Sequence, residues 1–304
     1  MTAPTAAAPH AAPVPPTPVE PAGPVPRRRR RTPGGGTVLR YLVLVLMVVL
    51  LAGPLLWQLS LSLKGAGDAL YDRPPRLIPT DPTLANFGAV LDRVPVLRYL
   101  GNSALVALMA VVGNIVGATL AGYALARLRF RGRAVATAVF VAALLVPVET
   151  VIVSQFLVVR SLGLTDTLLG VVLPGAVAAL NVLLMRNAFA GLPDELEEAA
   201  TIDGANAWQR FLRICVPQVT GVITVVAIFA FVGAWNDFLW PLIVLSSEEN
   251  YTLTVGLNRL RGTFYDDPRL IAAGTIIALV PIITFFVLLQ RYFFRGLESG
   301  GLKG

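Results

Sequence analysis

The side chains that could do chemistry in this sequence are few, and their densest group lies between Leu192 and Pro217. Four acids fall within five residues there, namely Asp194, Glu195, Glu197 and Glu198. Carboxylates can act as acids, bases or metal ligands, but each role needs a matched partner. The one histidine, His10, lies near the N-terminus, and the one cysteine is Cys215, so the apolar part can form neither a Ser/His dyad nor a His/Cys metal site. No GxxxxGK[ST] phosphate-binding loop occurs. We therefore expect no catalytic residue, no metal site and no bound cofactor.

Two further acids, Glu149 and Asp237, fall within apolar stretches. An ionised group at the centre of a membrane costs about 2.5 to 3.5 kcal/mol on insertion scales, so each needs a partner or water. We expect Glu149, which follows Pro147, to face a bundle interior, where it contacts either a solute or a backbone carbonyl freed by a kink. The neighbours of Asp237 are Trp235, Asn236 and Trp240. They fit either an interfacial aromatic belt or the outer mouth of a pathway, and the candidates for a translocation path are Trp235, Asn236, Asp237 and Glu149.

These residues are carried by a strongly apolar chain. Of the 304 residues, 55% are hydrophobic and 14% are charged, whereas a soluble domain has nearer a quarter charged residues. Six apolar spans are long enough to cross about 30 Å of hydrocarbon as helices. They cover approximately residues 38–63, 100–126, 134–159, 168–189, 219–245 and 270–294. The fold class is therefore an all-α integral membrane protein with six transmembrane helices.

The basic residues predict the topology. Residues 1–36 form an Ala/Pro-rich tail, predicted to be disordered, that ends with the arginine run Arg27 to Arg31, and residues 37–304 form the six-span domain. The net charge of +7 could suggest nucleic acid, but arginines beside apolar spans are more typical of a topology signal. The short loop from Arg127 to Arg133 contains four arginines. We therefore expect no nucleic-acid partner, both termini in the cytoplasm, and a cytoplasmic location for residues 192–217.

Small residues and prolines indicate how the spans pack. Gly113 and Gly117 form a small-xxx-small pair that allows two helices to approach closely, and we interpret it as ordinary helix packing. Pro147 and Pro174 lie inside two spans and should kink them.

The stretch from Leu192 to Pro217 predicts two short helices that meet at a glycine. Pro193 suits a helix start, and acids in the first turn suit the helix dipole. Gly204 suits the left-handed position that ends a helix. A second helix is expected from Ala205 to Cys215, with Pro217 opening the next span. An amphipathic helix resting on lipid is the alternative, but anionic lipid would repel this acidic first helix.

The spacing of this stretch resembles the EAA loop of ABC-importer permeases. Glu198, Ala199 and Ala200 are followed after three residues by Gly204, and Ile214 and Pro217 complete the pattern. Val216 stands where the family usually has leucine. Three further segments are similar to signatures of the carbohydrate-type permeases: Trp235 to Leu242, Gly163 to Thr167 (with Asp166 where asparagine is commoner), and Gly296 to Gly304. The likeness covers residues 38–304 and is greatest to the six-span partner of the maltose-type pair.

The resemblance implies a type I importer permease fold whose EAA loop is a coupling helix. It assigns ATPase docking to Glu198, Ala199, Ala200, Asp203, Gly204 and Pro217. The implied partners are a second permease, two cytoplasmic ATPase subunits that use ATP, and an extracytoplasmic sugar-binding protein, in a bacterial plasma membrane. An ion-gradient-driven secondary transporter remains the alternative, although it would need several ionisable residues at mid-membrane.

Overall fold

The computed structural model describes residues 35–70, 76–262 and 266–301, and within these ranges the chain is helical, with one isolated bridge between Lys64 and Pro82. The chain divides into two compact units, residues 1–51 and 52–304. The division falls inside α1 (Gly35–Ser62). Residues 1–34 of the predicted tail, which include its arginine run, lie outside the described residues.

The described part of the first unit is the N-terminal half of α1. Its side chains from residue 39 to residue 51 are exposed, and most are leucine or valine. A helix that is apolar all round is typical of a membrane span, because lipid is its natural solvent.

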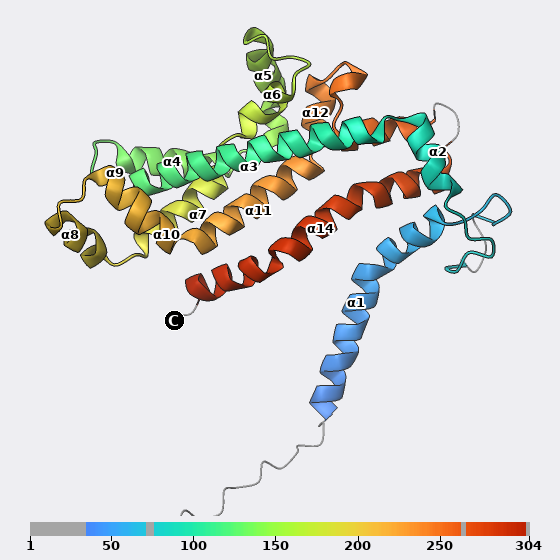
Figure 1. Ribbon diagram of the computed structural model, residues 1–304, viewed down its shortest axis with the longest axis horizontal. Helices are drawn as coiled ribbons and strands as arrows, with labels where there is room; N and C mark the ends of the chain where they lie inside the picture. The colour runs from blue at the N-terminus through green and yellow to red at the C-terminus, as the bar shows by residue number, and fades with distance from the viewer. Residues whose placement is uncertain (1–34, 71–75, 263–265, 302–304) are drawn as a thin grey trace, which may run out of the picture. The chain divides into compact units, whose positions relative to one another are not determined.

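The second unit is built around α3 (Val96–Arg127), an uninterrupted helix of 32 residues (Figure 1). It packs against α7 (Ala179–Ala190) and α11 (Thr220–Asn236), and α14 (Pro268–Gly301) packs on α11 and on α2 (Ala85–Arg93). All three apolar core clusters contain α3 side chains: Tyr99 in the first, Val106 in the second and Tyr123 in the third. The α3 helix is therefore the central element of this unit.

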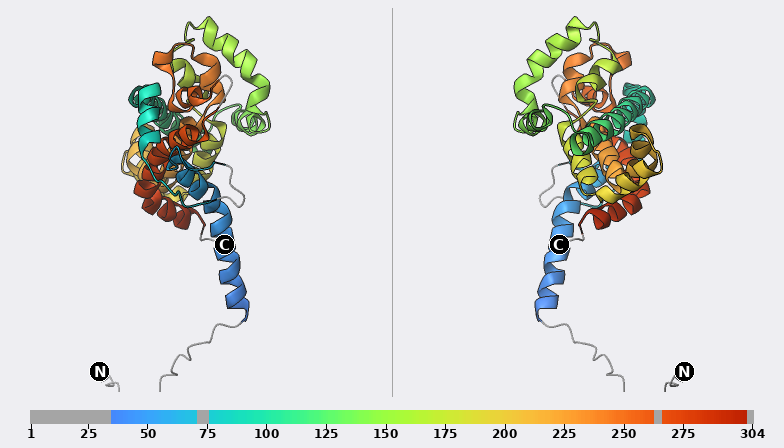
Figure 2. Two further views of the ribbon diagram at one scale, coloured as in Figure 1. Left: turned by 90° about the vertical axis from the view of Figure 1, so that its right-hand side faces the viewer. Right: turned by 90° about the vertical axis from the view of Figure 1, so that its left-hand side faces the viewer.

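Two of the predicted spans are bent pairs of helices, and a third bent pair joins Ala207–Gln218, which precedes the predicted fifth span, to α11. The axes of α4 (Arg133–Ala143) and α5 (Val148–Ser161) differ by 108° across Pro147, and the pair forms an arch at the edge of the unit (Figure 2). The pair formed by α6 (Leu168–Val172) with the turn Leu173–Gly175 and by α7 bends by 46° just after Pro174. Both predicted proline kinks are confirmed.

The third bend, of 78°, precedes α11. The predicted fifth span also ends early, because α11 stops at Asn236 and a separate short helix, α12 (Leu239–Val244), follows. Among the described residues, three single helices and these three bent pairs are long and apolar enough to cross a membrane, which agrees with six spans.

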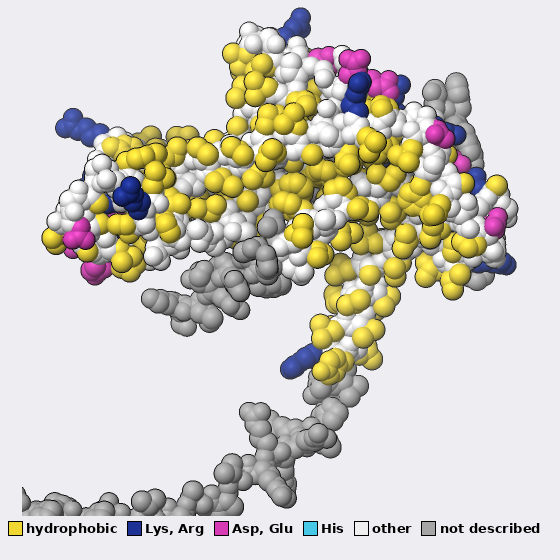
Figure 3. Space-filling model, viewed as in Figure 1, with side chains coloured by type: hydrophobic (Ala, Val, Ile, Leu, Met, Phe, Trp, Pro, Cys, Tyr) yellow, Lys and Arg dark blue, Asp and Glu magenta, His cyan; other side chains and the backbone are white. Residues whose placement is uncertain are grey.

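The remaining short helices lie in the connections. One connection contains α8 (Asp194–Ile202), α9 (Ala207–Gln209), the π-helical turn Arg210–Cys215 and α10 (Val216–Gln218). The connection before α14 contains α12, the turn Glu248–Asn250, α13 (Leu253–Leu257) and the turn Asn258–Leu260. On the face shown in Figure 3, hydrophobic side chains cover the middle of the second unit and charged ones gather towards its ends.

The glycines of α3 allow its close contact with the segment that leads into α7. A Cβ atom at Gly113 would lie 2.8 Å from the carbonyl oxygen of Ala176, and one at Gly117 would overlap the side chain of Val177. A Cβ atom at Gly122 would lie 2.6 Å from that of Met185. The interpretation of the small-xxx-small pair as helix packing is therefore confirmed.

This packing predicts opposite effects for two glycine-to-alanine substitutions in α3. Gly113→Ala should lower stability by about 1 to 3 kcal/mol, because the backbone of Ala176 must move. Gly101→Ala is the matched control, since nothing lies within 4 Å of its Cβ position, and it should raise stability by up to about 1 kcal/mol through helix propensity. Thermal unfolding in detergent measures both, and a stabilising Gly113→Ala would contradict the close packing.

Candidate functional site

The acidic stretch folds as the predicted helix, and its two ends have clear local causes. Pro193, with φ −60° and ψ 138°, is the residue before the helix rather than its first residue, and acids occupy the first turn of α8. At the other end Gly204 has φ +82°. Its N–H donates to the carbonyl of Thr201 (3.1 Å), and the N–H of Ala205 donates to that of Ala200 (2.9 Å), which is the Schellman pattern. The predicted glycine stop is confirmed.

The second helix begins two residues later than expected. Asn206 caps it, because its side chain accepts from the N–H of Gln209 and the Gln209 side chain accepts from the N–H of Asn206, both at 2.9 Å. Pro217 lies within α10 rather than at the start of the next span, which begins at Thr220 after the 78° bend. Pro217 has no N–H to donate to Arg213, and the helix there widens into the π-helical turn.

The predicted docking residues differ in exposure. Ala200 is buried at 6% and contributes packing. The other five are exposed: Glu198, Ala199, Asp203, Gly204 and Pro217. Ile202 and Trp208 are 86% and 59% exposed, and neither was predicted to be part of this surface. Exposed apolar side chains of this size, together on a polar loop, are typical of an interaction surface.

Two shallow hollows flank the glycine turn. One, of about 290 Å³, is lined by residues of α8 and by Arg210, and the other, of about 270 Å³, is lined by Asp203 to Ala205 and by residues of the second helix. The segment 192–217, which we call the knob, therefore has a recess on either side of Gly204.

Glu197 attaches α8 to α3, a role that the sequence analysis did not assign. Its Oε2 accepts a hydrogen bond from the hydroxyl of Tyr123 at 3.1 Å. Its Oε1 lies 3.3 Å from Nε of Arg127, and Oε2 lies 3.8 Å from Nε of Arg210. The Glu197 side chain is 18% exposed, so the ion pairs offset the cost of removing its charge from water.

Arg127 also holds the C-terminal end of α7. Its Nε donates to the carbonyl of Phe189 at 3.0 Å, and its other nitrogens contact the carbonyl of Leu192 and the carboxylate of Asp194. Beneath these polar contacts, the ring of Tyr123 packs against Phe189 and Phe211 with centroids 5.4 and 4.9 Å apart. The knob is therefore fixed to the bundle by both ionic and aromatic contacts.

The four path candidates lie in different environments. Trp235 is buried at 4%, and its indole N–H donates to the carbonyl of Ala278 in α14 at 3.3 Å. Trp240 is also buried and donates to the carbonyl of Val171 at 3.1 Å. The alternative of a lipid-facing aromatic belt is therefore wrong for these tryptophans. Asn236 is exposed and donates to Val232 within its own helix. Of the four candidates, Asp237 alone lines the cavity between α3, α6, α7 and α11.

Glu149 was expected to face a bundle interior, and this expectation is wrong for the isolated chain. It lies in the first turn of α5, next to the bend, and it is exposed, as are all residues from 141 to 151. The 108° bend turns this segment away from the core (Figure 2).

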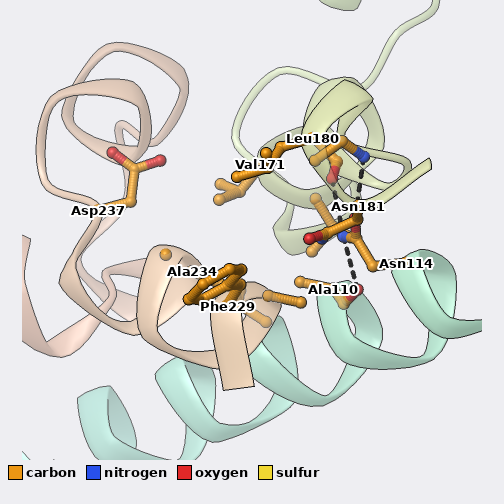
Figure 4. Close-up of a pocket in the computed structure, with 14 residues that line it drawn as sticks. Ala110, Asn114, Val171, Leu180, Asn181, Phe229, Ala234 and Asp237 are labelled. Carbon is orange, nitrogen blue, oxygen red and sulfur yellow. Dashed lines mark hydrogen bonds between the residues drawn. The ribbon is translucent and has the colours of Figure 1, made fainter. Parts of the chain in front are cut away.

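A cavity of about 280 Å³ lies between α3, α6, α7 and α11. Figure 4 shows Asp237 on one side of it and Asn114 and Asn181 on the other. Asn114 donates to the carbonyls of Ala110 (3.0 Å) and Gly175 (3.1 Å), and its Oδ1 accepts from Ala178 N–H (2.9 Å) and from Asn181 (2.8 Å).

The second asparagine is left with an unused acceptor. Asn181 is 3% exposed, and its Oδ1 has no hydrogen-bond partner in the part of the chain that the structure describes. The cavity thus combines apolar walls with two polar groups, the Asn181 amide oxygen and the Asp237 carboxylate. Each asparagine stands between apolar or small neighbours within a predicted span, and that signal in the sequence could have identified both.

Asp166 joins the α5–α6 loop to the segment after α12. It has φ +55°, a conformation that asparagine and aspartate tolerate best. Its carboxylate accepts from the N–H groups of Ser246 and Ser247, both at 2.9 Å, and from the Ser247 hydroxyl. The Ser247 hydroxyl is the main reason that the pKa of Asp166 falls to about 2, with backbone N–H donors adding to the effect.

Comparison with known proteins gives three findings. Residues 113–299 match the family described as binding-protein-dependent transport system inner membrane component. An arabinooligosaccharide transport system permease protein of Halalkalibacterium halodurans is 34% identical over 227 residues, which cover 74% of this chain and 81% of the relative. An inner membrane ABC transporter permease protein of Escherichia coli is 34% identical over 269 residues, 87% of this chain and 95% of the relative.

A solved structure has the same fold. It is a chain of a bacterial ABC transporter involved in the import of the acidic polysaccharide alginate, with a TM-score of 0.75 and 23% identity, covering 84% of this chain and 95% of that chain. The similarity supports the predicted all-α importer permease fold.

The depressed pKa of Asp166 predicts an acid-dependent stability difference. Asp166→Asn should melt below the wild type at neutral pH, because the ionised carboxylate binds its donors more strongly. With a folded pKa of about 2 against the ordinary aspartate pKa of 3.8, this contribution is present above pH 4 and is lost as pH falls toward 2. Thermal unfolding at pH 7 and pH 3 should show the difference narrowing in acid. A difference that stays constant would contradict the prediction, and Asp92→Asn, an exposed position, is the control.

Proposed function

This chain belongs to the family of binding-protein-dependent transport system inner membrane components, and on that premise we propose that it is the permease subunit of an ATP-driven ABC importer for a sugar or sugar-like solute. With a second permease it would form the membrane path, and an extracytoplasmic binding protein would deliver the solute. The arabinooligosaccharide permease among its relatives supports the sugar class. The chain is a transport component rather than an enzyme.

The exposed knob around Gly204 is the observation that carries the proposal. The sequence has no phosphate-binding loop of its own, so ATP would be bound and hydrolysed by a partner. In our proposal an ATPase subunit docks on Glu198, Ala199, Asp203 and Gly204, and Ala200 supports them from below. The recesses on either side of the turn would receive side chains of that partner, and exposed Ile202 and Trp208 would become buried.

The exposed bend between α4 and α5 supports a second permease as partner. The exposed side chains from 141 to 151 are apolar except for Glu149 and Thr150. A carboxylate facing lipid there would cost about 2.5 to 3.5 kcal/mol. A solute path between two permeases would supply water or a polar partner instead. In our proposal Glu149 would therefore lie on the path, and the apolar remainder of the bend would contact the second permease or lipid.

The cavity beside Asp237 supports a solute path through the middle of the bundle. Sugar hydroxyls are hydrogen-bond donors, and the Asp237 carboxylate and the unpartnered Oδ1 of Asn181 are acceptors in an otherwise apolar wall. Asn236 is exposed one residue before Asp237 and belongs to the same proposed path, and Trp235 would support it by packing.

The orientation follows from the charge distribution. We propose that the chain lies in a bacterial plasma membrane with both termini in the cytoplasm, which places α8 on the side of the ATPase. Membership of the importer family argues against the alternative of an ion-gradient-driven transporter.

ATPase association should fail when the glycine turn is altered. Gly204→Asp should lower ATPase retention at least about tenfold, because the left-handed turn is strained and a charge enters the docking surface. Gly132→Asp is the matched control, since Gly132 has φ +89° and likewise has nothing within 4 Å of its Cβ position. Affinity purification through a tagged ATPase measures retention, with membrane insertion checked for both variants. Unchanged retention of Gly204→Asp would remove the docking assignment.

Solute uptake should depend on the ATPase. Proteoliposomes that hold both permeases, the ATPase and the binding protein should take up labelled sugar with ATP, and omission of the ATPase should abolish uptake. Uptake by this chain alone without ATP would contradict the importer function and favour a gradient-driven transporter.

A further inference from the structure

We propose that α3 transmits a displacement from α8 to the segment 244–260 at the opposite end of the bundle. Hydrogen bonds of Tyr123 and of Tyr99 connect α3 to these two elements, and we call these two contact sites its polar joints. The inference rests on the proposed function, because it describes how docking of the ATPase at α8 would reach the side on which the binding protein acts. Both tyrosines act as positioning residues and contact no solute.

The joint at the α8 end is formed by Tyr123 and Arg127, one helical turn apart on α3. Both contact the Glu197 carboxylate, at 3.1 Å from the hydroxyl and 3.3 Å from Nε. Among the four acids of α8, Glu197 alone contacts two side chains of α3, whereas Glu198, next to it, is exposed. A displacement of α8 must therefore either move the end of α3 or break these contacts.

The joint at the opposite end is formed by the first two turns of α3. The hydroxyl of Tyr99 donates to Oε1 of Glu248 at 3.0 Å. Asn102 donates to the carbonyls of Glu249 and Tyr251 at 2.8 and 3.0 Å, and Ser103 accepts from the N–H of Leu253 at 2.8 Å.

Close packing adds to these polar contacts. A Cβ atom at Gly256 would overlap the ring of Tyr99, which is 0% exposed, so α13 lies directly against that ring. The segment 244–260 also reaches the cavity rim, because the hydroxyl of Thr254 donates to the carbonyl of Asp237 at 2.7 Å. Movement of α3 would therefore be passed to Asp237 through this segment.

The stretch of α3 between the joints is suited to transmit a displacement. It contains no proline, and Tyr99 and Tyr123 are 24 positions apart, or about 36 Å at 1.5 Å per residue. Among the described elements that contact α8 or its continuation, the other two candidate spans are bent, by 46° before α7 and by 78° before α11. A bent pair can absorb a displacement at its bend, whereas an unbroken helix moves as one body.

The two tyrosines allow a clean test, because Tyr→Phe removes one hydroxyl and keeps the packed ring. The complete complex of both permeases, the ATPase and the binding protein is reconstituted in nanodiscs, and ATP hydrolysis is measured with and without sugar-loaded binding protein. Tyr99→Phe and Tyr123→Phe should each lower the stimulation by the binding protein about fivefold or more, a typical coupling between sites. ATPase retention should stay at the wild-type level.

The double variant Tyr99→Phe/Tyr123→Phe distinguishes transmission along α3 from two independent local defects. If α3 links the ends in series, the double variant should lose no more stimulation than the worse single variant. Independent effects at about 36 Å would instead multiply, and that result would overturn the inference. Tyr251→Phe is the control, since its hydroxyl donates to Ser246 within the same segment and bonds no residue of α3.

Two further outcomes are decisive. Full stimulation in both single variants would overturn the inference, and so would loss of the ATPase from Tyr123→Phe, since the joint would then serve docking alone. A wild-type complex that retains no ATPase would instead refute the proposed function, so the two failures are distinguishable.

Discussion

The Glu197 carboxylate is the contact on which the geometry of the knob depends. A carboxylate that is largely withdrawn from water is costly unless it is paired, and Glu197 finds Tyr123 and Arg127 on α3 and Arg210 on the second helix. Three separate parts of the chain thereby meet at one side chain. With Glu197 turned inward, the neighbouring side chains of α8 are turned outward, and Glu198 and Ile202 remain available to a partner.

A second constraint acts within the apolar part, where no water can satisfy broken backbone hydrogen bonds. Three of the candidate spans are bent, and the bend before α7 frees the carbonyl of Gly175 and the N–H of Ala178. Asn114 of α3 bonds both groups. The polar residue thus repairs the break, and the same break opens the cavity beside Asp237. The bend before α7 and the buried Asn114 therefore depend on each other.

The two ends of the bundle therefore have different characters that fit the proposed importer. The α8 end has an acidic knob with exposed apolar residues, and the opposite end has an Asp166-centred network of hydrogen bonds, with the small cavity between them. In the proposed importer the energy source is a separate ATPase subunit that acts on the α8 end. The unbroken α3 connects the site where that source would dock with the site where a solute would enter.

The sequence by itself determined the class, the six spans, the kinks at Pro147 and Pro174 and the glycine stop at Gly204, because apolar length, proline and left-handed glycine act locally. Spacing also identified the family. The tertiary structure alone decided that Glu197 rather than Glu198 faces the bundle, that Ala200 and Trp235 are buried, and that Glu149 is exposed. Helical periodicity says which residues share a face, but it does not say which neighbour covers that face. That depends on the bend angles and on contacts between residues far apart in the chain, such as Tyr123 with Glu197.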